Sequence, residues 1–85
     1  MESGTVDLGQ ISSMDTKSFS VKFNKVHSKN PNAVIVSYDT YSWFYGSCHV
    51  EYASISNSGF NGDYIPIVIG NGNAGCTVHW LAIWE

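Results

Sequence analysis

The C-terminal segment of the chain, TVHWLAIWE, constrains the fold more than any other stretch of the sequence. Apolar and polar residues alternate at its start, which is typical of a β-strand because successive side chains of a strand point to opposite faces. The alternation then gives way to apolar residues on both faces. One face carries Val78, Trp80, Ala82 and Trp84, and the other carries Thr77, His79, Leu81 and Ile83. The interior of a small domain covers one face of such a strand, so the second face requires another cover.

The rest of the sequence also predicts strands, and no window predicts a helix. Apolar residues at i, i+3, i+4 and i+7 with a capping residue do not occur together. Short alternating runs separated by turn residues occur instead, as in an antiparallel β-sandwich. We therefore predict an all-β fold, a six-stranded antiparallel β-sandwich. The expected strands are Ser3–Gly9, Lys17–Val26, Ala33–Tyr38, Ser47–Ile55, Phe60–Ile69 and Thr77–Glu85.

Two of these strands carry a further expectation. Ala33–Tyr38 is nearly all apolar, which indicates a strand that is covered on both faces. Pro66 lies inside Phe60–Ile69 and has no backbone N–H to donate, which places that strand at a sheet edge or at a bulge. The segment SNSG (Ser56–Gly59) reads as a hairpin connection.

The composition predicts a single small domain, residues 1–85, with a partner. Apolar residues make up 44% of the chain and charged residues only 13%, so the chain is globular rather than disordered. A 9.3 kDa domain has much surface for its volume, so some of this apolar surface stays outside or contacts another chain. We therefore expect an oligomer.

The charge pattern argues against nucleic acid as a partner. The net charge is −3 and arginine, the residue best suited to phosphates and guanine edges, does not occur. The four lysines lie between residues 17 and 29 and would form at most a weak basic stripe; a solvated strand edge is the simpler interpretation. The sequence as given shows no signal peptide and no apolar run near 18 residues, so we expect no membrane insertion.

Motifs of cofactor, metal and catalytic chemistry are weak in this sequence. GNGNAG (residues 70–75) matches G-x-G-x-x-G, but the dinucleotide fingerprint requires a helix after it, and a strand is expected here. A hairpin loop explains its glycines. His27, His49 and His79 lack the spacing of zinc ligands, and the seven acidic residues are dispersed. The sequence therefore predicts no cofactor, no metal site and no enzyme.

The two cysteines, Cys48 and Cys76, fall in or beside expected strands. Two cysteines are too few for a disulfide scaffold, and a free cysteine in a strand usually acts as a small buried apolar residue. A single disulfide between them stays an alternative.

The segment YDTYSWFYGS (residues 38–47) reads as an aromatic loop between the third and fourth expected strands. Aromatic residues with a polar group at a loop tip suit stacking against a sugar or contact with a protein partner. The alternative is that they pack back over the core, and the sequence does not decide between the two. The aromatic residues are Tyr38, Tyr41, Trp43, Phe44 and Tyr45.

The order of several motifs resembles the H-type lectin domain family. These motifs are ESGTVDLG, FSVKF, NPNAVIVS, ISNSGF and VHWLAIW, and together they cover essentially the whole chain. The resemblance implies a sandwich that assembles as a homotrimer and binds N-acetylgalactosamine-type sugars between neighbouring protomers. The neighbours would cover the second face of the last strand. Related modules occur in bacterial and phage structural proteins, including tail fibres, so the resemblance also implies a place outside the cell or on a virion surface.

The family's sugar-binding residues transfer only in part. An Asp before the second strand corresponds to Asp15, and an Arg at the start of the fourth strand falls on Ser47. A Trp-His pair that ends the fifth strand falls on Val68 and Ile69. A Tyr that begins the last strand falls on about Ala74. The stacking ring and the charged donor are thus missing from the family's positions, and other residues would have to supply them. The candidate carbohydrate-binding residues are Asp15, Trp43, Tyr45, Ser47, Asn71 and Asn73.

We therefore expect a non-enzymatic carbohydrate-binding module whose weak sites gain avidity from three linked copies. Its partners would be glycans of the galactose type and other copies of the chain. The alternative is a structural trimerisation unit or receptor-binding tip without a monosaccharide site. The missing ring and arginine favour this alternative, whereas the aromatic segment and the asparagine-rich loop favour sugar. A His79 between protomers would become charged at low pH and loosen the assembly.

Overall fold

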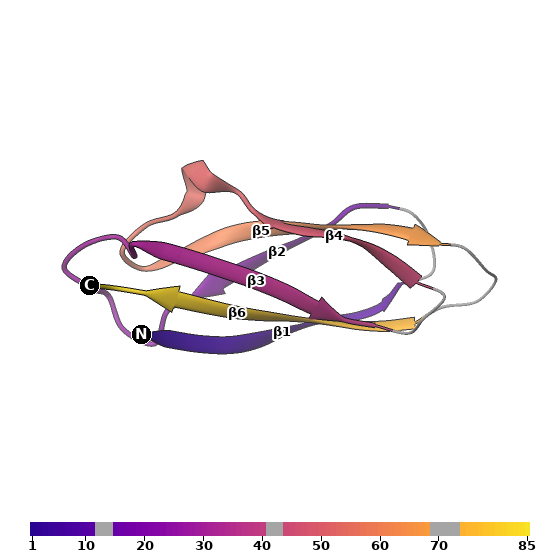
Figure 1. Cartoon of the computed structure of the whole chain (residues 1–85), viewed down its shortest axis with the longest axis horizontal. Coiled ribbons are helices and arrows are strands. Elements are labelled where there is room, and N and C mark those ends of the chain that lie inside the picture. The colour runs from indigo at the N-terminus through magenta and orange to yellow at the C-terminus, as the bar shows by residue number, and fades with distance from the viewer. Residues whose placement is uncertain (12–14, 41–43, 69–73) are drawn as a thin grey trace.

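The computed structural model describes residues 1–11, 15–40, 44–68 and 74–85. These residues form two three-stranded antiparallel sheets, so the predicted all-β architecture is confirmed (Figure 1). The first sheet has the strand order β1-β6-β3 and the second has the order β2-β5-β4. The strands are β1 (Glu2–Ile11), β2 (Lys17–Lys22), β3 (Ala33–Asp39), β4 (Phe44–Val50), β5 (Gly59–Val68) and β6 (Ala74–Ile83), and a short 3₁₀ turn, η1 (Tyr52–Ser54), follows β4.

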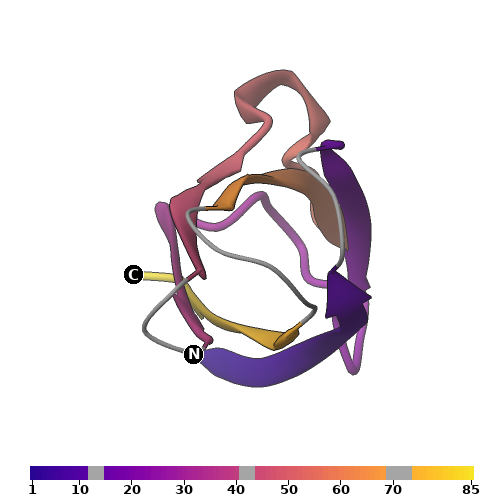
Figure 2. The same ribbon diagram turned by 90° about the vertical axis from the view of Figure 1, so that its right-hand side faces the viewer.

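The two sheets face each other across one core (Figure 2). Among the six described strands, only β4 and β5 are consecutive neighbours within one sheet; each of the other consecutive pairs has its two strands in different sheets. Both chain termini lie at the same end of the sandwich (Figure 1), which we call the terminal end. The largest core cluster joins both sheets and consists of Phe19, Val21, Phe23, Phe60, Val78, Trp80 and Ala82.

The structure shows which face of β6 lines this core. Val78 and Ala82 are completely buried, and Trp80 is 9% exposed, so the face that contains them points inward. Leu81 and Ile83 point outward from the first sheet and are only partly buried. The alternation predicted from the sequence is therefore confirmed, with its inner face now assigned.

A β-bulge in β1 reverses the alternation of that strand. The register between β1 and β6 shifts between Asp7 and Gly9, and Gly9 has a φ of 73° that favours glycine. The Asp7 carboxylate accepts a hydrogen bond of 2.8 Å from the Gly9 N–H. Because of the extra residue, Ile11 points into the core, where it is 1% exposed.

The expectation that Ala33–Tyr38 is covered on both faces is wrong for the single chain. β3 is an edge strand of the first sheet, and its residues alternate between exposed and half-buried. Ile35 is 54% exposed on the outer face. The run of apolar residues misled the prediction because apolar side chains also occur on a solvent-facing side of a sheet.

The expectation that Pro66 marks an edge strand or a bulge is also wrong, since β5 is the central strand of the second sheet and its register with β4 does not shift over the described pairs. The last β2–β5 pair is Lys17 with Tyr64. Along β5, the backbone N–H and C=O groups of successive residues point alternately toward β4 and toward β2. The backbone of Pro66 faces β2, as that of Tyr64 does. Since Pro66 lies two residues beyond that pair, no β2–β5 ladder bond depends on its missing N–H.

The boundaries around the aromatic segment differ from the prediction. β3 continues to Asp39 and β4 already begins at Phe44, so most of the expected loop is strand. Tyr38 does not belong to a loop tip: its ring packs in the core at 4.8 Å from that of Tyr64. The expected strand over Ser47–Ile55 ends at Val50 and gives way to η1.

Candidate functional site

Asp15 and Ser47 are the candidate sugar-binding residues whose side chains the structure describes. Asp15 is exposed just before β2, and Ser47 is exposed on β4 opposite Ile65. The backbone of Tyr45 pairs with that of Ile67. Three further candidates, Trp43, Asn71 and Asn73, lie outside the described residues, so their position stays a prediction.

On one side of the sandwich, β1 and β5 end and β4 and β6 begin. Ile11 pairs with Ala74, and Phe44 pairs with Val68, so both sheets end at the right-hand side of Figure 1. We call this side the loop end. Asp15, just before β2, lies on the loop-end side, whereas Ser47 is the middle residue of β4, so a sugar site that they share stays a prediction.

The outer face of the first sheet carries an apolar strip, which we define as Ile35, Leu81 and Ile83. Ile35 on β3 lies directly opposite Leu81 on β6, and Ile83 follows two residues later on the same face. Side chains that are directly opposite in a sheet contact each other, so these residues form one patch. Ser3 of β1 borders the patch opposite Leu81.

A histidine–carboxylate pair lies next to the strip on the same outer face. The Nε2 atom of His79 is 2.6 Å from Oδ2 of Asp39, and in the single chain the two side chains are 45% and 80% exposed, respectively. Because a carboxylate only accepts, Nε2 carries the proton of this contact. His79 therefore shares the outer face of the first sheet with the apolar strip, and its place between protomers stays a prediction.

A groove of about 570 Å³ opens at the terminal end, between the edges of β3 and β4. Its volume falls in the range of about 300–1,000 Å³ that is common for small-ligand sites. Val34 and Val50 contribute apolar side chains from the two edge strands. The complete lining is Asn30, Pro31, Asn32, Ala33, Val34, Val50, Tyr52, Ala53 and Ile55, and we call it the Tyr52 groove.

The wall that carries Tyr52 is fixed to β5. The hydroxyl of Ser54 donates 2.6 Å to the Glu51 carbonyl and accepts 2.8 Å from the N–H of Asn61. The Glu51 N–H also donates to the Asn61 carbonyl at 2.9 Å. These bonds set the backbone of η1 and leave the side chain of Tyr52 87% exposed at the mouth of the groove.

The opposite wall, residues 30–34, is fixed to the C-terminal segment. The Asn32 N–H donates 2.7 Å to the Ile83 carbonyl, and the Asn32 side-chain oxygen accepts 2.9 Å from the Glu85 N–H. Asn30 reaches across to the other wall, since its Nδ2 donates 3.4 Å to the carbonyl of Ile55. Both walls are therefore held by bonds that do not involve a ligand.

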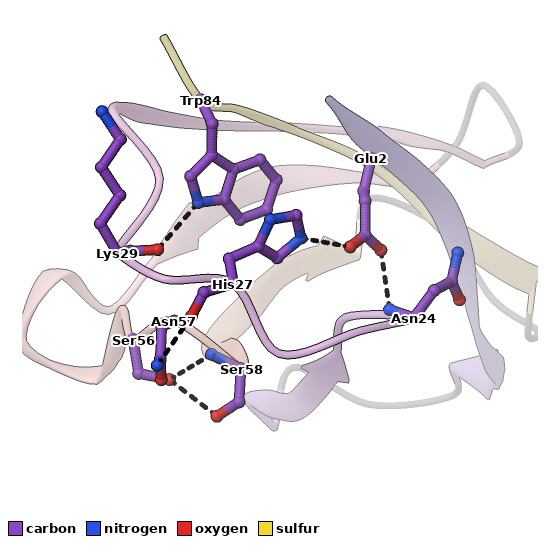
Figure 3. A network of polar contacts seen from close by, with 8 residues as sticks. All are labelled: Glu2, Asn24, His27, Lys29, Ser56, Asn57, Ser58 and Trp84. Atoms are coloured by element: carbon purple, nitrogen blue, oxygen red, sulfur yellow. Dashed lines mark hydrogen bonds and ion pairs between the residues drawn. The ribbon is translucent and has the colours of Figure 1, made fainter.

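A partly buried polar network supports this end of the molecule (Figure 3). The His27 ring stacks on the indole of Trp84 with centroids 3.6 Å apart, and its Nε2 is 2.6 Å from a carboxylate oxygen of Glu2. The other Glu2 oxygen accepts 2.7 Å from the Asn24 N–H. The hydrogen bond from His27 is the main cause that lowers the pKa of Glu2, followed by that from Asn24.

The same network joins four distant parts of the chain. The Trp84 indole N–H donates 2.9 Å to the Lys29 carbonyl. Asn57 closes a two-bond contact with His27, because its side chain donates to the His27 carbonyl and its own carbonyl accepts the His27 N–H. The loop from Asn24 to Asn32, which leads into the groove, is thus tied to β1, to the C-terminal segment and to the turn before β5 (Figure 3).

Other kinds of site are not found in the described part of the chain. No group of three or more His, Cys, Asp or Glu side chains among these residues could hold a metal ion. No helix among them is long and apolar enough to cross a membrane. Cys48 and Cys76 are free thiols that pack beside Tyr64, and burial raises the pKa of Cys76 to about 11.

Comparison with protein-family models, with curated proteins and with solved structures gives no significant match to this chain.

Sequence reasoning missed Tyr52 and the Glu2–His27–Trp84 network. In an unbroken strand over Ser47–Ile55, Tyr52 would share the inward face with Cys48 and Val50. It is exposed only because the strand ends at Val50. The network joins residues up to 82 positions apart, from Glu2 to Trp84, and no local pattern predicts such a contact.

Proposed function

We propose that this domain is a non-enzymatic carbohydrate-binding module that works as a homotrimer, as the resemblance to the H-type lectin family implies. The observation that carries the assembly part of the proposal is the apolar strip on the outer face of the first sheet. Ile35 and its neighbours Leu81 and Ile83 gather apolar surface on a face that the chain itself does not cover. Burial of this face against neighbouring copies would supply the cover that the last strand requires.

The two-sheet architecture and the loop end support the sugar-binding part of the proposal. The sandwich has the number and direction of strands that the resemblance implies. Asp15 lies on the loop-end side of it, and the side chains of Asp15 and Ser47 are exposed to solvent. A carboxylate and a hydroxyl are suitable partners for sugar hydroxyls.

The mass of the protein in solution tests the trimer. Light scattering after size-exclusion chromatography should give three times the chain mass, and Ile35→Lys should shift the protein to monomer because three charges would meet at the interface. Ile65→Lys is the matched control: Ile65 is 40% exposed on the outer face of the other sheet, so its variant should stay trimeric. A monomeric wild type would refute the assembly.

A glycan array that includes terminal galactose and N-acetylgalactosamine tests the sugar. Binding that Asp15→Ala or Trp43→Ala weakens would establish the lectin function at the loop end. A trimer that binds no glycan would favour the second candidate, a structural or receptor-binding tip. The apolar strip supports the second candidate as well as the first, because it indicates assembly and does not indicate whether a sugar binds.

A further inference from the structure

We propose that the Tyr52 groove is a second saccharide site, at the end of the sandwich opposite to the loop end. The groove lies where β3 begins and β4 ends, whereas the candidate Asp15 lies toward the end where β3 ends and β4 begins, and Ser47 lies in the middle of β4. The two sites share no residue. This inference does not depend on the trimer or on the loop-end site.

The charge of the groove selects a neutral ligand. Among its lining residues the only ionisable side chain is the phenol of Tyr52, so the described walls place no lysine, carboxylate or imidazole in the groove. A phosphate or a carboxylated ligand would lose its hydration without gaining a counter-charge. The same argument disfavours a basic peptide. A neutral pyranose requires no counter-charge.

The Tyr52 ring provides a face for the apolar side of a sugar. It is 87% exposed and belongs to a turn that the Ser54 hydroxyl fixes to β5, so its backbone needs no rearrangement on binding. An aromatic ring with a polar hydroxyl suits a ligand that has one apolar face and a polar rim. Val34 and Val50 add apolar surface from the floor.

Two asparagines place a donor and an acceptor on the facing wall. Asn32 accepts from the Glu85 N–H through its side-chain oxygen, which fixes the orientation of the amide and leaves the Nδ2 hydrogens without a partner among the described residues. Asn30 donates through Nδ2 to the Ile55 carbonyl, which leaves its own oxygen as an acceptor. A sugar hydroxyl donates and accepts at once, so this pair of groups matches vicinal hydroxyls.

The Glu2–His27–Trp84 network makes the asparagine wall rigid. It ties the segment before Asn30 to β1 and to the C-terminal segment through the bonds to Asn24 and Lys29 (Figure 3). A site whose walls are ordered before binding loses little conformational entropy when the ligand arrives. The groove therefore combines a ring, an apolar floor and fixed amides, which define a saccharide site.

The test is a titration of ¹⁵N-labelled protein with methyl α-galactopyranoside, methyl α-glucopyranoside and methyl N-acetyl-α-galactosaminide, followed by amide chemical shifts. The expected result is a saturable shift of the groove amides, of which Val34, Ala53 and Ile55 report on both walls. Tyr52→Ala should weaken this binding by about tenfold or more, the loss expected when an aromatic anchor is removed. Tyr52→Phe should retain most of it.

Two further variants separate the groups of the site. Asn32→Asp keeps the oxygen that accepts from Glu85 but removes the free N–H donors, so it should lose saccharide binding while the protein stays folded. Val26→Ala is the control, since Val26 is 68% exposed in the supporting loop and does not line the groove. It should bind like the wild type.

The outcomes distinguish this inference from the proposed lectin function. Shifts confined to the amides around Lys17 and Ser47 would overturn the groove site and leave the loop-end site standing. Shifts in the groove caused by an uncharged extended peptide, and by none of the three sugars, would assign the groove to a protein partner and overturn the inference. If none of the three sugars shifts any amide signal, both the groove site and the loop-end sugar site are refuted.

Discussion

The two halves of the core are built from different chemistry. At the terminal end the core is aromatic: Phe23 packs 5.8 Å from Trp80, 6.1 Å from Phe60 and 5.0 Å from Trp84, measured between ring centroids. At the loop end the buried cluster is Ile11, Tyr64 and Cys76, with Cys48 and Tyr38 against it. We call these the aromatic half and the Tyr64 half.

The polar groups of the two halves also differ. In the aromatic half the polar groups beside the core are only partly buried and are paired, as the Glu2–His27 contact at 2.6 Å and the Trp84 N–H bond to Lys29 show. In the Tyr64 half the hydroxyl of Tyr64 is buried without a hydrogen-bond partner among the described residues. An unpaired buried hydroxyl costs free energy, so the comparison indicates that the aromatic half stabilises the fold and the other half tolerates defects.

The largest expected effect comes from removing the central ring of the aromatic half. Trp80→Ala should lower the free energy of unfolding by about 3–5 kcal/mol because it leaves a large cavity between Phe23 and Phe60. Cys76→Ala, on the same strand in the other half, should cost only about 1 kcal/mol. Urea denaturation followed by tryptophan fluorescence and circular dichroism measures both. Equal losses would contradict the division into a stabilising and a tolerant half.

A pair of tyrosines within the Tyr64 half gives effects of opposite sign. Tyr64→Phe should raise the free energy of unfolding by about 1 kcal/mol, because it removes a completely buried hydroxyl that has no partner. Burial also raises the pKa of Tyr64 to about 12. Tyr38→Phe is the matched control and should lower the stability by about 1 kcal/mol, since its hydroxyl donates 2.7 Å to the carbonyl of Gly46 and accepts from the Gly46 N–H.

The same denaturation series decides the outcome. If Tyr64→Phe destabilises the protein as much as Tyr38→Phe, the Tyr64 hydroxyl has a partner in solution and the contrast between the two halves is lost.

The smallest expected effect is a pH dependence that belongs to the aromatic half. The folded state lowers the pKa of Glu2 below its usual value of 4.5, so the contribution of Glu2 to stability is fully present above about pH 4.5. It is lost as the pH falls through the lowered pKa. Glu2→Gln should therefore be less stable than the wild type at pH 7, and the difference should shrink in acid.

Unfolding by urea at a series of pH values from neutral to acid measures this difference. Glu51→Gln is the control, because the exposed Glu51 side chain takes no part in the network. A constant difference between Glu2→Gln and the wild type across the series would show that the Glu2–His27 contact is not the titrating element.

The sequence was informative where the signal is local. Alternation in VKF and VHWLA predicted these two strands. It also predicted that Val21 lies on the apolar face of the first and that Val78 and Trp80 lie on one face of the second, because side chains of a strand alternate between its two faces in any surroundings. Local reasoning failed at Pro66, which was expected at an edge but lies in the central strand β5, because a proline is tolerated where the neighbouring strand has already ended.

The candidate sites divide in the same way. Asp15 and Ser47 were named from motif order, and the structure places Asp15 on the loop-end side and Ser47 in the middle of β4, whereas the partners Trp43, Asn71 and Asn73 remain predictions. The exposure of Tyr52 could not be predicted from the sequence, because it depends on the residue at which β4 ends. That in turn depends on the bonds that Ser54 and Asn61 make between η1 and β5.

The sequence by itself determined that this protein is all-β, with one face of each strand apolar enough to line a core. The tertiary structure alone decided which strands became edges, which face of β6 turned inward, and how Glu2, His27 and Trp84 came together to support a groove. The physical reason is the distance along the chain over which each interaction acts. Alternation and turn propensity act between residues a few positions apart, whereas burial, pairing and the shape of a groove depend on contacts between segments that lie far apart in the chain.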